Sequence, residues 1–160
     1  MIKKSILNFI RRIVGTEKIL KQTQSVLSEI YRAQMFHDAT IDSEWYTHKD
    51  LSLGPAAIDY GTAYVIYRVL DMIHPTNLLE FGLGQSSKII HQYANYYAKP
   101  ALTIEHSAEW IKFFSNDVKG KYPVHTKLVE LEESLYRNYK TQTYRALHEV
   151  LGGGSMILYL

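Results

Sequence analysis

The sequence predicts an α/β fold: a Rossmann-like parallel sheet of about four strands, truncated after the fourth, with helices on both faces and an N-terminal helical extension. Two observations predict it. From residue 77 onward, short apolar runs alternate with amphipathic stretches of helical length, as in βαβ units. Two glycines then follow the first apolar run, where such folds place a strand-to-helix turn.

Composition and charge narrow the class of protein. The chain has 160 residues, 46% hydrophobic and 21% charged, which suits one globular domain. A net charge of +2 gives no reason to expect a nucleic-acid partner. The absence of cysteine excludes disulfides, thiolate catalysis and cysteine-based zinc sites. No apolar run approaches the ~18 residues of a membrane span, and no signal peptide is evident, so we expect a cytoplasmic protein, at most peripheral to the inner membrane.

Residues 1–36 are expected to form two amphipathic helices. Residues 2–14 place apolar side chains on one face and basic side chains on the other. Gly15 and Thr16 predict a helix end followed by a new N-cap, so the second helix should run over residues 17–36. A basic amphipathic helix can lie on an anionic membrane surface, here through residues 2–14, or pack on its own domain or on another subunit. The sequence leaves these alternatives open.

Residues 37–54 form a polar, turn-rich stretch, predicted to be a solvated connector or a lid over a nearby pocket. No metal site is expected there, because the spacing matches no tight metal-ligand motif. Its histidines and carboxylates are His37, Asp38, Asp42, Glu44 and His48.

Residues 55–160 make up the predicted Rossmann-like domain. Pro55 suits the first turn of a helix that should run to Ile73. Ser107 is the expected N-cap of a later helix, and Gly120 its C-terminal stop. The expected strands are Asn77–Phe81, Ala101–Glu105, Val124–Leu131 and residues 155–160, and the helices between them Ser86–Tyr97, Ala108–Val118 and Leu135–Leu151.

The glycine turn is the predicted ligand site. Gly82 and Gly84 allow the backbone to turn sharply and to approach a ligand closely, and Ser86 opens the following helix. Glu105 ends the second strand, where a carboxylate can accept both hydroxyl protons of a ribose. Ser87 stands where a dinucleotide-binding motif has its third glycine, which disfavours an NAD-type oxidoreductase without excluding it.

Glu80 is the unusual residue of the first strand. A carboxylate in a strand covered on both faces is costly unless it is paired or ligated. Most dinucleotide-binding strands are apolar at this position, so Glu80 points to a ligand that brings a positive charge. We therefore expect a cation opposite Glu80.

The segment "LLEFGLGQSS" followed by "TIEH" resembles the first two motifs of class I S-adenosylmethionine-dependent methyltransferases. More narrowly, "VIYRVLDMIHPTNLLEFGLGQSSKIIHQYA" with "TIEHSAEWIKFF" is similar to methyltransferases of bacterial surface-polysaccharide gene clusters. The resemblance covers about Ser43 to Leu131. It implies methyl transfer from S-adenosylmethionine to a small-molecule or glycan acceptor.

The resemblance also implies a set of cofactor-binding residues. Glu80 would lie near the methionine ammonium group, Gly82 and Gly84 would pass under the cofactor, and Glu105 would hold the ribose hydroxyls. The full expected set is Glu80, Gly82, Gly84, Gln85, Ser86, Glu105 and His106. No catalytic residue is assigned, although His37, His48 and His106 are candidate bases for an oxygen acceptor.

The family has seven strands, whereas four are expected here. The chain would then be a fragment, a natural truncation or one part of a sheet that another subunit completes. An open edge and exposed apolar surface predict self-association, most simply a homo-oligomer. A third functional alternative is a non-catalytic assembly or membrane-surface module in which residues 1–36 act and the half-sheet is a remnant.

Overall fold

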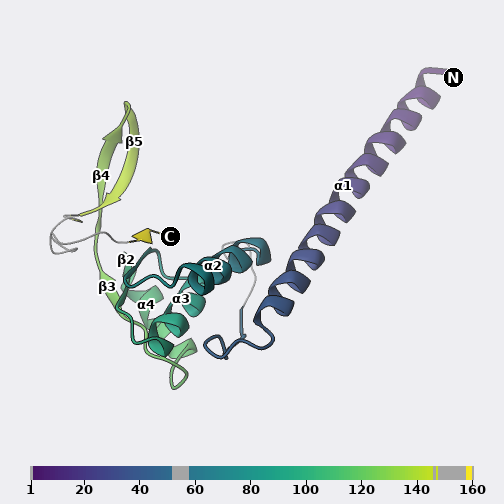
Figure 1. The fold of residues 1–160 in the computed structure, drawn as a ribbon. Coiled ribbons are helices and arrows are strands. Elements are labelled where there is room, and N and C mark those ends of the chain that lie inside the picture. The colour runs from purple at the N-terminus through teal and green to yellow at the C-terminus, as the bar shows by residue number, and fades with distance from the viewer. Residues whose placement is uncertain (1, 52–57, 146, 148–157, 160) are drawn as a thin grey trace.

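The computed structural model describes residues 2–51, 58–145, 147 and 158–159, and side chains in residues 14–51, 58–145 and 147. A long N-terminal helix projects from a small α/β body, and a β-hairpin extends from the other side of that body (Figure 1). The helices are α1 (Ile2–Thr40), α2 (Tyr60–Ile73), α3 (Gln85–Tyr96) and α4 (Ala108–Asp117). The strands are β1 (Leu78–Phe81), β2 (Ala101–Glu105), β3 (Thr126–Leu128), β4 (Leu131–Tyr136), β5 (Tyr139–Tyr144) and β6 (Leu158–Tyr159).

The main sheet is parallel, with strand order β3-β2-β1-β6. α3 connects β1 to β2, and α4 connects β2 to β3, so strands and helices alternate as the sequence predicts. The register pairs Glu80 with Thr103, which places both side chains on one face of the sheet. The predicted α/β class is confirmed.

The two sheet faces have different neighbours. Leu78 and Ala101 share one face and belong to a core cluster with Ile89 and Ile90 of α3. On the other face, Leu79 and Ile104 cluster with Val129, and the partly buried Tyr144 and Leu147 pack against them. A segment predicted to be helical therefore covers this second face, although its conformation differs from the prediction.

α1 corrects the predicted break at Gly15. One helix of 39 residues runs through Gly15 and Thr16 and continues to Thr40, beyond the predicted end at residue 36. A single glycine costs about 1 kcal/mol relative to alanine inside a helix. Ending one helix and starting another leaves several backbone hydrogen bonds unmade and adds an unfavourable nucleation step. Together these cost more free energy than one glycine inside a continuous helix.

The hairpin corrects the first part of the predicted helix Leu135–Leu151, up to Tyr144. β4 and β5 pair antiparallel, and Arg137 and Asn138 join them with φ values of 49° and 69°. Two successive residues with positive φ are typical of the tight turns that match the twist of a hairpin. Tyrosine and threonine, which favour strands, fill β5. The third strand is correspondingly shorter than predicted, at Thr126–Leu128.

The segment that follows α1 is more deeply buried than a solvated connector. Trp45 stacks on Tyr67 of α2 with ring centroids 4.7 Å apart, and Tyr46 has no exposed surface. Both belong to the core cluster that contains Phe36 and Tyr93. The predicted connector thus supplies two core aromatic residues through its middle.

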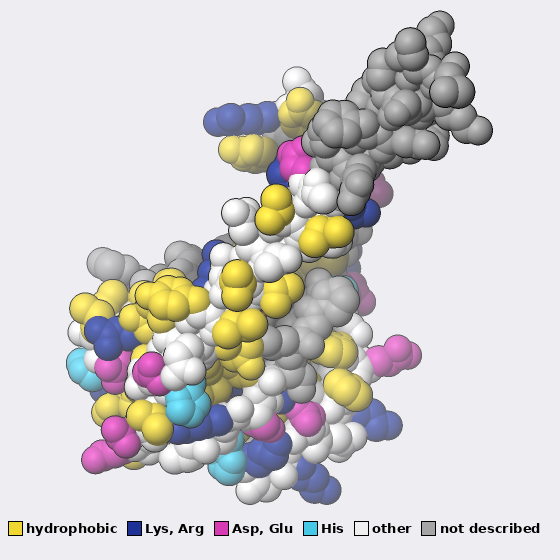
Figure 2. All heavy atoms as spheres, turned by 90° about the vertical axis from the view of Figure 1, so that its right-hand side faces the viewer, with side chains coloured by type: hydrophobic (Ala, Val, Ile, Leu, Met, Phe, Trp, Pro, Cys, Tyr) yellow, Lys and Arg dark blue, Asp and Glu magenta, His cyan; other side chains and the backbone are white. Residues whose placement is uncertain are grey.

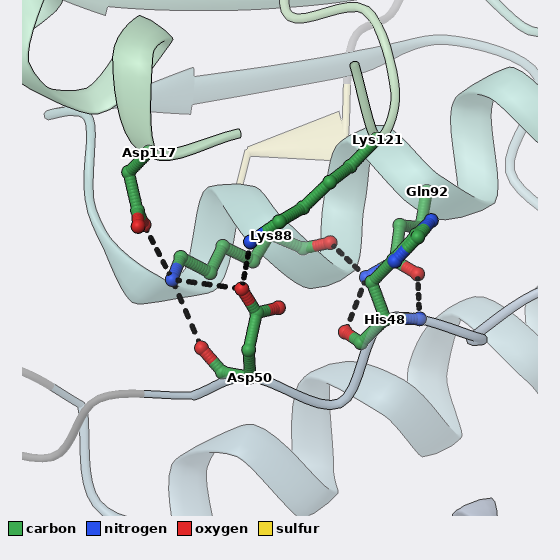
Figure 3. A network of polar contacts seen from close by, with 6 residues as sticks. All are labelled: His48, Asp50, Lys88, Gln92, Asp117 and Lys121. Carbon is green, nitrogen blue, oxygen red and sulfur yellow. Dashed lines mark hydrogen bonds and ion pairs between the residues drawn. The ribbon is translucent and has the colours of Figure 1, made fainter. Parts of the chain in front are cut away.

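α3 holds the next few residues of this segment by polar contacts (Figure 3). The Gln92 side chain accepts from the backbone N–H groups of Thr47 and His48 at 3.1 and 2.8 Å and donates to His48 O at 3.0 Å. Lys88, 2% exposed at its side chain, donates to Asp50 O at 2.9 Å. The Lys88 ammonium also lies 2.7 Å from Asp117 of α4 and 3.7 Å from the Asp50 carboxylate, which Lys121 contacts as well.

Three predictions fall partly outside the described residues: the helix start at Pro55, the end of the predicted helix Leu135–Leu151, and most of the fourth strand with the glycines before it. The described part of that strand, β6, pairs with β1. α2 begins instead at Tyr60, where Asp59 caps it by accepting from Thr62 N at 2.7 Å. Within the described residues, no helix combines the length and the hydropathy that a bilayer crossing requires.

Candidate functional site

The glycine turn lies at the carboxyl end of β1. Gly82 has φ of 86°, which favours glycine, and its N–H donates to Ile104 O at 2.8 Å. Gly84 is the N-cap of α3, and its N–H donates to Ser87 Oγ at 2.9 Å. A Cβ built at either glycine meets no atom within 4 Å. The space around the turn is therefore open to a ligand.

Glu80 lies beside the turn and is 3% exposed. Its carboxylate accepts hydrogen bonds from Ser86 Oγ at 2.5 Å, Ser87 Oγ at 2.6 Å and Thr103 Oγ1 at 2.8 Å. Burial raises the pKa of the Glu80 carboxyl, and the three hydroxyl donors only partly oppose that increase. Three hydroxyl groups of the chain thus satisfy the Glu80 carboxylate, and the cation that a ligand would bring to it stays a prediction.

The contacts of Glu80 fix the start of α3. Ser87 bonds both Glu80 and the Gly84 backbone, so the carboxylate supports the turn through one hydroxyl. Thr103, which also bonds Glu80, lies 2.9 Å from Nε2 of His91 on α3. Burial, with a smaller contribution from nearby His125, lowers the pKa of His91 to about 4. His91 is therefore neutral at pH 7.

Glu105 ends β2 and is 4% exposed. One oxygen, Oε2, accepts from Leu83 N in the glycine turn at 2.9 Å. The other, Oε1, accepts from His106 N at 2.7 Å and Ser107 N at 2.9 Å. Burial alone would raise the pKa of Glu105, but these three backbone donors outweigh it and hold the pKa below its usual range. A stably ionised carboxylate is thereby joined to the turn.

Trp110 is a component of the site that sequence reasoning missed. Its indole Nε1 donates to Leu83 O at 2.6 Å, so Trp110 binds the carbonyl and Glu105 the N–H of the same turn residue. The ring is 40% exposed and stacks on Phe113 with centroids 5.2 Å apart. An aromatic residue three positions after the Ser107 N-cap is a signal that could have been noticed, although Trp110 could equally have been a surface residue. Ser87 and Thr103 were also missed as partners of Glu80. Only the strand register and the start of α3 show that their hydroxyl groups face this carboxylate.

The remaining predicted residues divide into two groups. Gln85 and Ser86 begin α3 at the turn, and the His106 ring lies 2.9 Å from Glu105 through Nδ1. The structure therefore brings together all seven predicted cofactor-binding residues at the carboxyl ends of β1 and β2. The other two candidate bases lie elsewhere: His37 contacts Asp38 on α1, and His48 packs against Tyr122.

No cluster of three or more metal-ligating side chains occurs in the part of the chain that the structure describes. Comparison with protein-family models, curated proteins and solved structures finds no match to this chain.

Proposed function

We propose that the chain binds S-adenosylmethionine at the glycine turn and transfers its methyl group to a small-molecule or glycan acceptor. The supporting observation is the 2.9 Å hydrogen bond from Leu83 N to Glu105 Oε2. It joins a glycine turn after one parallel strand to an acid after the next strand. Nucleoside ligands bind in the crevice at such strand ends.

The donor and acceptor groups fit this ligand. Glu105 Oε2 accepts one hydrogen bond from the residues that the structure describes, and a carboxylate oxygen can accept two, so a ribose hydroxyl can bind there. Among the described residues, Glu80 Oε1 likewise accepts from Ser86 Oγ, and it can take a further donor. Two carboxylates beside the turn favour a cationic ligand over a phosphate-bearing one such as NAD.

The sulfonium of the cofactor would supply a reactive methyl group, so the protein needs mainly to align the acceptor and exclude water. His106 is the base that the geometry favours. Its Nδ1 lies 2.9 Å from the Glu105 carboxylate, which leaves Nε2 to take a proton from an acceptor hydroxyl. The role of Glu105 beside His106 is to hold the ring.

Isothermal titration with S-adenosylmethionine tests the proposal. We expect Glu105→Gln to weaken binding roughly ten- to hundred-fold, because one charge-assisted hydrogen bond contributes about 1.5–3 kcal/mol. Glu109→Gln is the matched control, because Glu109 is an exposed acid in the first turn of α4. Equal affinity in all three proteins would remove Glu105 from the site. Binding of NADH instead would favour the oxidoreductase alternative.

The length of α1 favours a second candidate, the non-catalytic assembly or membrane-surface module. A 39-residue helix extends well beyond what the α/β body covers (Figure 1). A chain that binds no nucleotide-like ligand but associates through α1 would support this candidate.

A further inference from the structure

One face of α1 contacts the body of the molecule. Glu29 accepts from Tyr60 N at 2.9 Å, Arg32 lies 4.0 Å from Asp59, and Phe36 is buried in the core. Helical spacing places residues 18, 22 and 25 on this same face, farther toward the N-terminus. They are the polar residues Lys18, Gln22 and Ser25.

The opposite face of α1 carries an apolar stripe. Its side chains are each 58–66% exposed, although they are large and hydrophobic. Among the residues that the structure describes, the body of the same chain leaves these side chains mostly exposed. Hydrophobic side chains follow the described part of α1 in the space-filling view (Figure 2). The stripe comprises Ile19, Leu20, Val26, Leu27, Ile30 and Tyr31.

The sequence extends this spacing toward the N-terminus. Ile6, Ile13, Leu20 and Leu27 are seven residues apart and so fill one of the two positions by which helices pair along a narrow apolar seam. The other position holds Phe9, Thr16, Thr23 and Ile30. The span from residue 2 to residue 31 is ~45 Å long, and a helix is ~10–12 Å wide. A strip of these dimensions gives roughly 500 Å² per chain, or ~1,000 Å² per pair, which reaches the lower limit of a specific interface.

We propose that the apolar stripe of α1 pairs with the same stripe of a second copy of this chain, with the two helices antiparallel. Charge favours this orientation. Residues 2–14 contain four basic residues and no acid, whereas the two acids and two lysines of residues 15–31 cancel. A parallel pair would align the four cations with themselves, and an antiparallel pair aligns them with a segment that carries no net charge.

Sedimentation velocity of the full chain over a range of concentrations tests the pairing. We expect a wild-type dimer and at least a hundred-fold weaker association for Leu20→Asp with Leu27→Asp. The matched control, Gln22→Asp with Ser25→Asp, adds the same charges to the polar face and should leave the dimer intact. Far-UV circular dichroism of each variant establishes that the body of the molecule remains folded.

Three results would overturn the pairing. The wild type could stay monomeric at ~100 µM. The stripe variant could remain as dimeric as the control, which would place the contact at another surface, such as a sheet edge. A monomer that co-sediments with anionic phosphatidylglycerol vesicles through the stripe would show that a membrane surface is the occupant.

Because the chain has no cysteine, single-cysteine crosslinking tests the orientation. An antiparallel overlap of residues 2–31 crosses near residue 16, so Thr16→Cys should form a disulfide-linked dimer and Thr23→Cys should not. Efficient crosslinking of both variants would mean a parallel pair and contradict the proposed orientation.

Discussion

At the scale of single residues, the two acids of the site show what a sequence can and cannot reveal. Glu80 and Glu105 were identified from their positions beside the glycine turn, and both are buried there. Their partners were not predicted. Ser86, Ser87 and Thr103 satisfy Glu80, because strand register and the start of α3 bring three hydroxyls to one carboxylate. That convergence depends on tertiary structure, which spacing along the chain does not encode.

The backbone of the glycine turn yields a stability prediction. Gly82→Ala should lower the free energy of unfolding by about 1–2 kcal/mol, because an L-residue resists φ of 86°. Gly84→Ala is the control, since Gly84 has an extended φ of −164° and equally open surroundings. Urea denaturation measures both. A Gly82→Ala protein as stable as Gly84→Ala would show that the turn does not hold this conformation.

His91 yields a prediction about pH. Its pKa is about 4 in the folded chain and 6.5 as the ordinary value, so between these pH values the unfolded chain binds the additional proton. The free energy of unfolding should therefore fall by about 3 kcal/mol as pH drops from 6.5 to 4. His91→Gln should remove this pH-dependent fall in the free energy of unfolding.

His37→Gln controls for the loss of a histidine, because its side chain is 61% exposed. Urea denaturation at several pH values compares the two variants with wild type. A His91→Gln profile parallel to that of wild type would contradict the assignment, as would the same change in His37→Gln.

At the scale of elements, the prediction succeeded where the spacing of apolar residues and the helix-capping residues indicate the same element bounds. α3, α4, β1 and β2 lie within one or two residues of their predicted bounds, and Ser107 caps α4 by accepting from Trp110 N at 3.2 Å. It failed where local signals were weak. The spacing of the apolar residues in 131–144 is compatible with either a helix or a strand. The turn at Arg137 and Asn138 decides that these residues pair as a hairpin.

Lys88 yields the prediction for the polar network on α3. Lys88→Met should lower the free energy of unfolding by about 2 kcal/mol, because it leaves Asp50 and Asp117 without their buried cation. Both carboxylates are partly solvated, at 39% and 43% exposure, so the effect should be smaller than for a fully buried pair.

The control for Lys88→Met is Lys21→Met, which removes a surface pair with Glu17 and should change stability by at most ~0.5 kcal/mol. Chemical denaturation of the two variants gives the comparison. Equal small losses would show that the Lys88 contacts do not hold the segment around Asp50 on α3.

At the scale of the whole molecule, the α/β class and the position of the glycine turn between β1 and α3 could be predicted, because both follow from the alternation of strands and helices. The conformation of residues 37–51 could not, since a polar composition conceals the two aromatic residues that fill the core. The projection of α1 was also unforeseen. Its glycine suggested a break, whereas the structure shows one continuous helix whose apolar face points away from its own domain.

The affinity of the Gly84→Ala protein for S-adenosylmethionine, measured together with its melting temperature, tests the central proposal most directly. A Cβ at Gly84 meets no protein atom within 4 Å, so it occupies the space that a ligand on the turn would need. The proposal predicts wild-type binding, a nearly unchanged melting temperature and at least a ten-fold loss of affinity in Gly84→Ala. No binding by the wild type, or equal binding by both proteins, would contradict it.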